Sequence, residues 1–139
     1  MTSSILTTHV GSLPRSKELS ELLFAKDKKE NIDQELFDNT VKKNVGEVVK
    51  RQLQVGIDIV SDGEMSKISY ATYVKDRIKG FSGESERRAP ADLDAFPAYK
   101  TKIANSGGTP TYTRPCCTSE LEIQDTQSLK NDIKNLSDS

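Results

Sequence analysis

The chain has 139 residues, of which 34% are hydrophobic and 29% are charged, and its formal net charge is -1. These values are typical of a soluble globular domain rather than a disordered or membrane-embedded chain. The near balance of 20 basic and 21 acidic residues provides no general attraction for nucleic acid or an anionic membrane. No apolar run approaches the roughly 20 residues that a membrane span needs, and the first residues do not resemble a secretory signal. We therefore expect one cytoplasmic domain without nucleic-acid or membrane partners.

The N-terminal segment predicts a strand, a turn and a helix. Ile5 and Leu6 begin a β-prone run that ends at the turn formed by residues 11–14, Gly-Ser-Leu-Pro. Ser16 is then well placed as the N-cap of a helix. That helix carries three leucines at helical spacing: Leu19, Leu22 and Leu23.

The strongest helical periodicity lies between about Asp33 and Val55. Its apolar residues recur at intervals of three and four positions: Phe37, Val41, Val45, Val48, Val49 and Leu53. Asn31 and Gln34 resemble a capping box at its start, and Gly56 suits the left-handed residue beyond its end. Residues 57–60, Ile-Asp-Ile-Val, then predict a second strand, which ends at a polar loop.

The rest of the chain predicts two further helices separated by a less regular region. One helix carries Ile68, Ala71, Val74 and Ile78 on one face and ends at Gly80, so that the first part of the chain has the order β-α-α-β-α. An excursion at about 81–110 contains three of the five prolines and one short helix around 92–96. Extended segments follow, and a last helix is expected to turn three residues inward: Leu129, Ile133 and Leu136.

Two loops at predicted strand ends are candidates for a binding site, because ligands of α/β proteins bind at the carboxyl ends of the strands. In the first, Gly11 allows close approach to the backbone, and the Ser12 N–H and hydroxyl can donate to a carboxylate. In the second, Asp62-Gly63-Glu64, the Glu64 carboxylate can accept hydrogen bonds from an ammonium group or take a proton. Both sequences are also common in ordinary turns, so neither is specific alone.

The residues that bind transition metals are few. His9 is the only histidine, and it suits a metal ligand, an acid–base group or, most commonly, a polar residue at a strand end. Cys116 and Cys117 are neighbours, so a disulfide between them would be strained and both thiols seldom reach one zinc ion. We therefore expect free thiols and no self-contained metal site.

Three segments, in this order, resemble the N-terminal part of the cobalamin-independent methionine synthase family, and most of all its shorter bacterial and archaeal-type members. They are TTHVGSLPRS at 7–16, VGIDIVSDGEMSKISYATYVKDRIKGFSG at 55–83 and RPCCTSELEIQDTQSLKNDIKNL at 114–136. The resemblance implies a (β/α)₈ TIM barrel that forms the family's catalytic domain. Because such a barrel takes about 250 residues, residues 1–139 are expected to form only its N-terminal part.

The resemblance also implies an activity, namely methyl transfer from methyltetrahydrofolate to homocysteine in methionine biosynthesis. Zinc activates the thiol in that family, which is chemically sound because a metal ion lowers the pKa of a bound thiol. The family's amino-acid pocket maps onto Val10, Gly11 and Ser12, which cradle the amino acid, and onto Glu64, which binds its amino group. Its zinc ligands lie later in the barrel, so none is expected in this chain, and related enzymes use other thiols such as coenzyme M.

Two functions follow from these observations. The first is the N-terminal part of a zinc-dependent S-methyltransferase, with the remaining barrel supplied elsewhere. The second is a truncated, non-catalytic binding or interaction module derived from that barrel. An open half-barrel exposes sheet edges and apolar helix faces, so we expect it to self-associate, to be covered by another chain such as the missing half of the barrel, or to be unstable.

Overall fold

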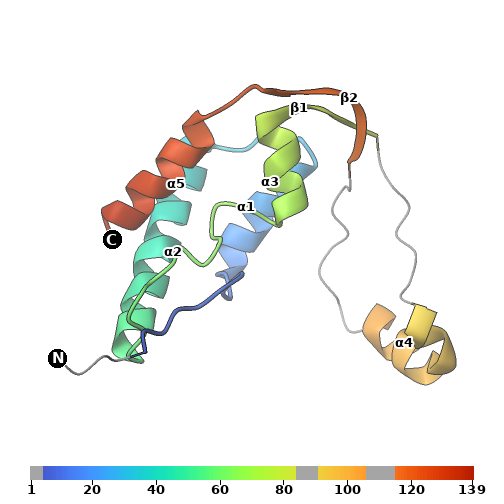
Figure 1. The fold of residues 1–139 in the computed structure, drawn as a ribbon, viewed down its shortest axis with the longest axis horizontal. Helices are drawn as coiled ribbons and strands as arrows, with labels where there is room; N and C mark the ends of the chain where they lie inside the picture. The colour runs from blue at the N-terminus through green and yellow to red at the C-terminus, as the bar shows by residue number, and fades with distance from the viewer. Residues whose placement is uncertain (1–4, 84–90, 106–114) are drawn as a thin grey trace.

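The computed structural model describes residues 5–83, 91–105 and 115–139. Its elements, in chain order, are α1 (Lys17–Asp27), α2 (Gln34–Gln54), α3 (Tyr70–Arg77), β1 (Ile78–Ser82), the 3₁₀-helix η1 (Ala91–Ala95), α4 (Pro97–Asn105), β2 (Cys116–Ile123) and α5 (Gln127–Ser137). The long helix α2 packs against α1 and α5, and the β1–β2 ribbon connects α3 with α5 (Figure 1). The described residues therefore form a mixed α/β structure, and the expected barrel is not seen among them.

The apolar face of α2 forms the centre of the core, as its periodicity predicts, except that Leu53 near its end is 60% exposed. The buried residues of the core come from α1, α2 and the loop after residue 60: Leu19, Leu23, Phe37, Val41, Val45, Val48, Val49 and Met65. Removing these side chains from water is the main source of stability for a helical layer of this kind. Side chains also cap the first two helices. Ser16 accepts a hydrogen bond from Leu19 N at the start of α1, as predicted, and α2 is capped by Asp33 rather than by Asn31.

The first and second predicted strands lie parallel to one another. Thr8 and Ile59 form a parallel bridge, and Thr7 O accepts hydrogen bonds from Asp58 N at 3.2 Å and Ile59 N at 3.0 Å. The Asp58 carboxylate in turn accepts from both Thr7 N and Thr7 Oγ1 at 2.8 Å. The predicted segments are thus paired as in an α/β fold, although the described residues form one bridge instead of a continuous ladder.

Gln52 of α2 fixes the end of the second segment. This buried side chain donates to Ser61 O at 2.8 Å and accepts from Ser61 N at 3.0 Å. Both polar ends of the amide are therefore satisfied inside the protein, which offsets the cost of burying them. The pairing also sets where the loop at 62–64 begins.

The region after α3 differs from the prediction. The helix ends at Arg77, and Ile78 belongs to β1, which pairs antiparallel with β2 in a register that joins Ile78 to Ile123. The predicted helix, which carried Ile68 and Ile78 and ended at Gly80, is therefore too long at both ends. Gly80 lies inside this ribbon with φ 96°, where a Cβ would approach Glu120 O to 2.6 Å, so only glycine fits.

The predicted excursion lies between the two strands of this ribbon. Its described part contains η1 and α4, which agrees with the short helix expected around 92–96 and extends it. Residues 84–90 and 106–110 of the predicted excursion, and residues 111–114 of the predicted extended segment, lie outside the described part of the chain.

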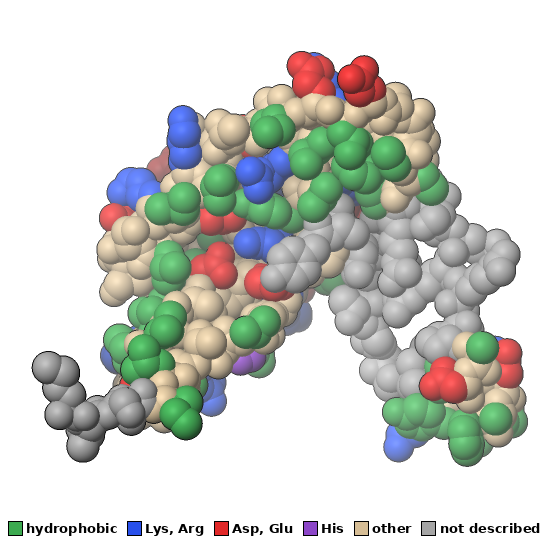
Figure 2. All heavy atoms as spheres, viewed as in Figure 1, with side chains coloured by type: hydrophobic (Ala, Val, Ile, Leu, Met, Phe, Trp, Pro, Cys, Tyr) green, Lys and Arg blue, Asp and Glu red, His purple; other side chains and the backbone are tan. Residues whose placement is uncertain are grey.

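Several apolar side chains remain exposed. Leu121 and Ile123 of β2 are 54% and 69% exposed, and Figure 2 shows apolar side chains along the edge of the molecule where the ribbon lies. In α5 the prediction of three inward residues is correct only for Leu136, which packs on the core, since Leu129 and Ile133 are exposed. None of the described helices has the length and apolar character needed to cross a membrane.

Candidate functional site

The two loops predicted to carry the site are in direct contact. Leu13 N donates to Gly63 O at 3.0 Å, which joins the backbone of the first loop to that of the second. Gly63 has φ 62°, and a Cβ added there would lie 3.0 Å from Leu13 Cβ. The close approach therefore depends on glycine at this position, both for the left-handed backbone and for space.

Ser12 and Glu64 meet across these loops. Ser12 Oγ donates to Glu64 Oε2 at 2.5 Å, although the two residues are 52 positions apart. Glu64 is 8% exposed, whereas Ser12 is exposed, so the pair lies where the interior meets solvent. A carboxylate in this position has remaining acceptor capacity for a second donor, such as an ammonium group.

The backbone of Glu64 adopts an uncommon conformation. Its φ of 58° lies in the left-handed region, which costs a non-glycine residue about 1–3 kcal/mol. Two side chains stabilise it locally: Asp62 Oδ1 accepts from Glu64 N at 2.9 Å, and Arg15 Nη2 donates to Glu64 O at 2.9 Å. The loop is therefore held in a conformation that its sequence alone does not favour.

Arg15 joins the first loop to the turn that follows Glu64. Besides its bond to Glu64 O, its Nη2 donates to Lys67 O at 2.6 Å. Burial lowers the pKa of the Arg15 guanidinium from its ordinary value, while the nearby carboxylates of Glu64 and Asp62 raise it. The guanidinium remains a cation at neutral pH, because arginine is not deprotonated in proteins.

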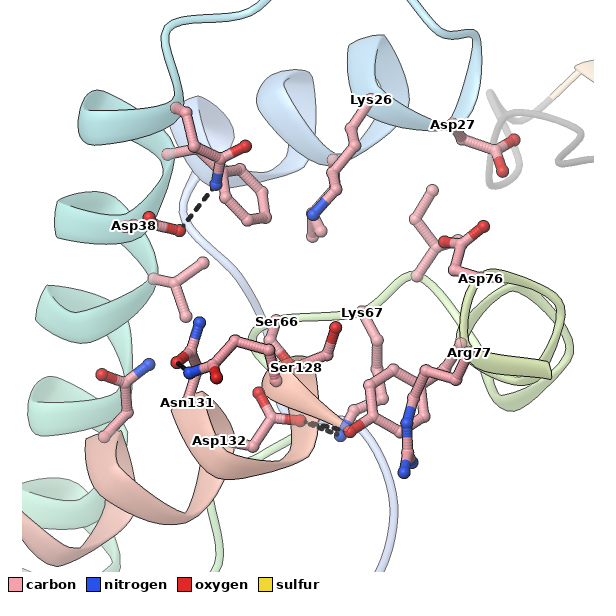
Figure 3. A pocket seen from close by; sticks show the side chains of 18 residues that line it. Lys26, Asp27, Asp38, Ser66, Lys67, Asp76, Arg77, Ser128, Asn131 and Asp132 are labelled. Atoms are coloured by element: carbon pink, nitrogen blue, oxygen red, sulfur yellow. Dashed lines mark hydrogen bonds and ion pairs between the residues drawn. The ribbon is translucent and has the colours of Figure 1, made fainter. Parts of the chain in front are cut away.

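Lys67 connects the second loop to α5. Its Nζ lies 3.6 Å from the carboxylates of both Asp62 and Asp132, and its side chain is 11% exposed. Tyr73 OH donates to Asp132 Oδ2 at 2.7 Å, and burial together with this carboxylate raises the pKa of Tyr73 to about 12. Figure 3 shows Asp132 turned toward Lys67, with Arg77 of α3 beside them.

A pocket of about 350 Å³ lies behind this network, between α1, α2, α3 and α5 (Figure 3). Its lining includes Lys67, Tyr73 and Asp132, which bind one another as described above. Ser12 and Glu64 are not part of its lining. The pocket is therefore separate from the predicted amino-acid site at the ends of the two parallel segments.

The remaining predicted residues lie beside the Ser12–Glu64 pair in the chain. Gly11 has φ 96° and open space where a side chain would be, so its backbone is accessible to a ligand. Val10, which precedes this glycine, is 84% exposed. His9 Nε2 lies 3.1 Å from Gly11 O, a local contact typical of a polar residue at a strand end.

The residues that bind zinc are not assembled in the described part of the chain. Cys116 and Cys117 are free thiols in β2, as expected, with Cys116 half-buried and Cys117 exposed. Among the described residues no three His, Cys, Asp or Glu side chains form a group that could hold a metal ion. The described side chains therefore do not fit a zinc site of their own, and we assign no step to a metal bound by them.

Sequence reasoning missed Arg15 and Lys67, although both lie within the motifs that were recognised. Each is a single basic residue in a short polar stretch, which ordinarily indicates exposed surface. Arg15 binds carbonyl groups of a distant loop, and Lys67 pairs with the nearby Asp62 and with Asp132, which is 65 positions further along the sequence. The one available signal was their proximity to the glycine turns.

Comparisons with known proteins agree with these motifs. Residues 5–130 match the family described as cobalamin-independent synthase, catalytic domain. A probable 5-methyltetrahydropteroyltriglutamate–homocysteine methyltransferase of Schizosaccharomyces pombe is 36% identical over 77 residues, and the corresponding enzyme of Bifidobacterium longum is 31% identical over 75. Each alignment covers 54% of this chain but 10% of the relative, so the matched segment spans about a tenth of those proteins.

A solved structure is also similar. The structure of a B12-independent methionine synthase from Shewanella sp., in complex with selenomethionine, matches with a TM-score of 0.57 and 21% identity. The match covers 95% of this chain and 34% of that one. The described residues thus share the fold of about a third of that structure.

Proposed function

This chain belongs to the cobalamin-independent methionine synthase catalytic domain family, and on that premise we propose that it binds homocysteine at the paired loops. Val10, Gly11 and Ser12 would hold the carboxylate end of the amino acid, and Glu64 would bind its ammonium group. The binding would serve methyl transfer from methyltetrahydrofolate to the homocysteine thiol. That the similar solved structure holds selenomethionine, an amino acid of closely related shape, supports this choice of ligand.

The contact between Ser12 Oγ and Glu64 Oε2 is the observation that carries the proposal. It places a mostly buried carboxylate beside an exposed hydroxyl and a glycine with open space around it. The Glu64 carboxylate complements the ammonium end of an amino acid, because a buried carboxylate forms strong hydrogen bonds with an ammonium group. Since the Ser12 hydroxyl already donates to Glu64, the carboxylate end would be held by backbone N–H groups of residues 10–12. The side chain of homocysteine would extend away from this pair, which leaves its thiol free for reaction.

Calorimetric titration of the chain with L-homocysteine tests this function. Glu64→Gln should weaken binding by about 1–3 kcal/mol, since it removes one charged hydrogen bond without changing the shape of the side chain. Glu35→Gln, at an exposed position in the first turn of α2, is the matched control and should bind as the wild type does. Equal affinity of the Glu64 variant and the wild type would overturn the assignment.

A second candidate function is a binding or interaction module that does not catalyse methyl transfer. The exposed apolar side chains of Ile5, Val10 and Val55, which are 72% to 95% exposed, favour association with another protein surface. An assay of zinc-dependent methylation of homocysteine separates the two candidates. Turnover by the purified chain, or by the chain mixed with the remaining part of a family barrel, would exclude the module, whereas homocysteine binding without turnover in either mixture would support it.

A further inference from the structure

We propose that Arg15 is a positioning residue of the amino-acid site, which holds Glu64 in the conformation that directs its carboxylate to Ser12. The inference rests on the proposed function for its binding readout, but its structural part can be measured without a ligand. Its basis is the set of hydrogen bonds around the Glu64 backbone.

A single nitrogen of Arg15 closes the turn that begins at Glu64. Nη2 donates to Glu64 O at 2.9 Å and to Lys67 O at 2.6 Å, the carbonyl groups at the two ends of that turn. Because Arg15 belongs to the first loop, these bonds also fix the second loop relative to Ser12. Leu13 N, which donates to Gly63 O at 3.0 Å, is the second connection between the loops.

The left-handed backbone of Glu64 explains why the two hydrogen bonds from Arg15 are needed. A glutamate with φ 58° persists only where surrounding contacts outweigh the local preference. Relaxation to an ordinary helical or extended φ would rotate the side chain away from Ser12. The hydrogen bonds from Arg15 therefore set the orientation of the Glu64 carboxylate and do not act through its charge alone.

Arg15 is poorly placed to contact a ligand itself. Its Nη2 is occupied by two carbonyl groups, and its Nε is buried with no hydrogen-bond partner among the described residues. The guanidinium geometry matters for this role, since the plane of the group fixes the directions of the two Nη2 N–H bonds, whereas the N–H bonds of an ammonium group rotate freely. We therefore assign Arg15 an effect that passes through Glu64.

Two variants test the structural part of the inference. In Arg15→Met, which keeps the apolar stem, the Cα and Cβ chemical shifts of Glu64 should leave their left-handed values; in Arg15→Lys they should move less. The matched control is Arg51→Met, at an exposed position in the last turn of α2, and should leave those shifts unchanged. Unaltered Glu64 shifts in both Arg15 variants would overturn the inference, and Arg15→Lys alone decides the matter if Arg15→Met does not fold.

A double-mutant cycle on homocysteine affinity tests the coupling. Arg15→Lys should weaken binding about tenfold in the wild-type background, as expected for disturbing one charged hydrogen bond, and should have no further effect in the Glu64→Gln background. Equal weakening in both backgrounds would show that Arg15 acts independently of Glu64 and would overturn the inference. If the wild type does not bind homocysteine, the proposed function fails, and the chemical shifts still decide the role of Arg15.

Discussion

Lys67 Nζ lies 3.6 Å from Asp132 Oδ2, and this ion pair joins the loop that carries Glu64 to the C-terminal helix α5. The two side chains are 11% and 12% exposed, so the pair is shielded from most of the solvent. Breaking one partner of such a pair leaves a charge with poor solvation, which is more costly than the loss of an exposed pair. The position of α5 is thus coupled to the loop of the proposed site.

Asp132→Asn should lower the free energy of unfolding by about 1–3 kcal/mol, because it weakens the bonds of both Lys67 and Tyr73 to this position. Urea denaturation measures the change. The control is Glu122→Gln, whose carboxylate pairs with Lys79 at an exposed site and should change stability by less than about 1 kcal/mol. Equal losses in the two variants would contradict the assigned importance of the buried pair.

Tyr73 should make the protein sensitive to alkali. Its pKa of about 12 in the folded protein exceeds the ordinary value of 10, so the folded state retains the phenolic proton over that range while the unfolded state loses it. Stability therefore falls as the pH rises from about 10 to 12, and it does so less in Tyr73→Phe. Denaturation midpoints measured across this range, with the phenolate absorbance recorded alongside, would show the difference. A phenolate signal from Tyr73 at pH 10 would contradict the assignment.

Two glycine substitutions should have opposite effects on stability. Gly63→Ala introduces a Cβ 3.0 Å from that of Leu13 at a residue with φ 62°, and should destabilise the protein by about 1–3 kcal/mol. Gly46→Ala, inside α2 with no atom within 4 Å of the added Cβ, should stabilise it by up to about 1 kcal/mol through helix propensity. Thermal unfolding of the two variants provides the comparison. A stabilising effect of Gly63→Ala would show that the loops are not in close contact.

The helical part of the fold is predictable from the sequence because its cause is local. The apolar periodicity of α2 and the cap at Ser16 depend on residues within one or two turns, and both predictions are confirmed apart from Leu53, which is exposed. Asp33, not Asn31, caps α2 because the helix begins at Gln34. Apolar periodicity locates the start of a helix only to within a few residues. The end of α3 is missed because Ile78 continues the apolar spacing but pairs with Ile123, a contact between distant segments.

The motifs of the proposed site can be found in the sequence, but the residues that support its loops cannot. Gly11, Ser12 and Glu64 follow β-prone segments, and the contact between Ser12 and Glu64 agrees with their expected proximity. Arg15 binds backbone carbonyl groups of the second loop, and Lys67 pairs with the distant Asp132. Sequence spacing provides no information on either contact. Leu129 and Ile133 are exposed because of how α5 packs on α2. Periodicity identifies the apolar face of a helix, but it does not say which element, if any, covers each residue of that face.

The most direct test of the amino-acid site is a titration of the nitrogen-15-labelled chain with L-homocysteine, followed by the backbone amide resonances. We predict that the amides of Gly11, Ser12 and Glu64 shift together and saturate with a single dissociation constant, because all three lie at the ends of the paired segments. The same titration of Glu64→Gln should require a higher concentration of homocysteine. Shifts confined to residues of the pocket between the helices, such as Asn131, or no shifts at all, would contradict the proposed site.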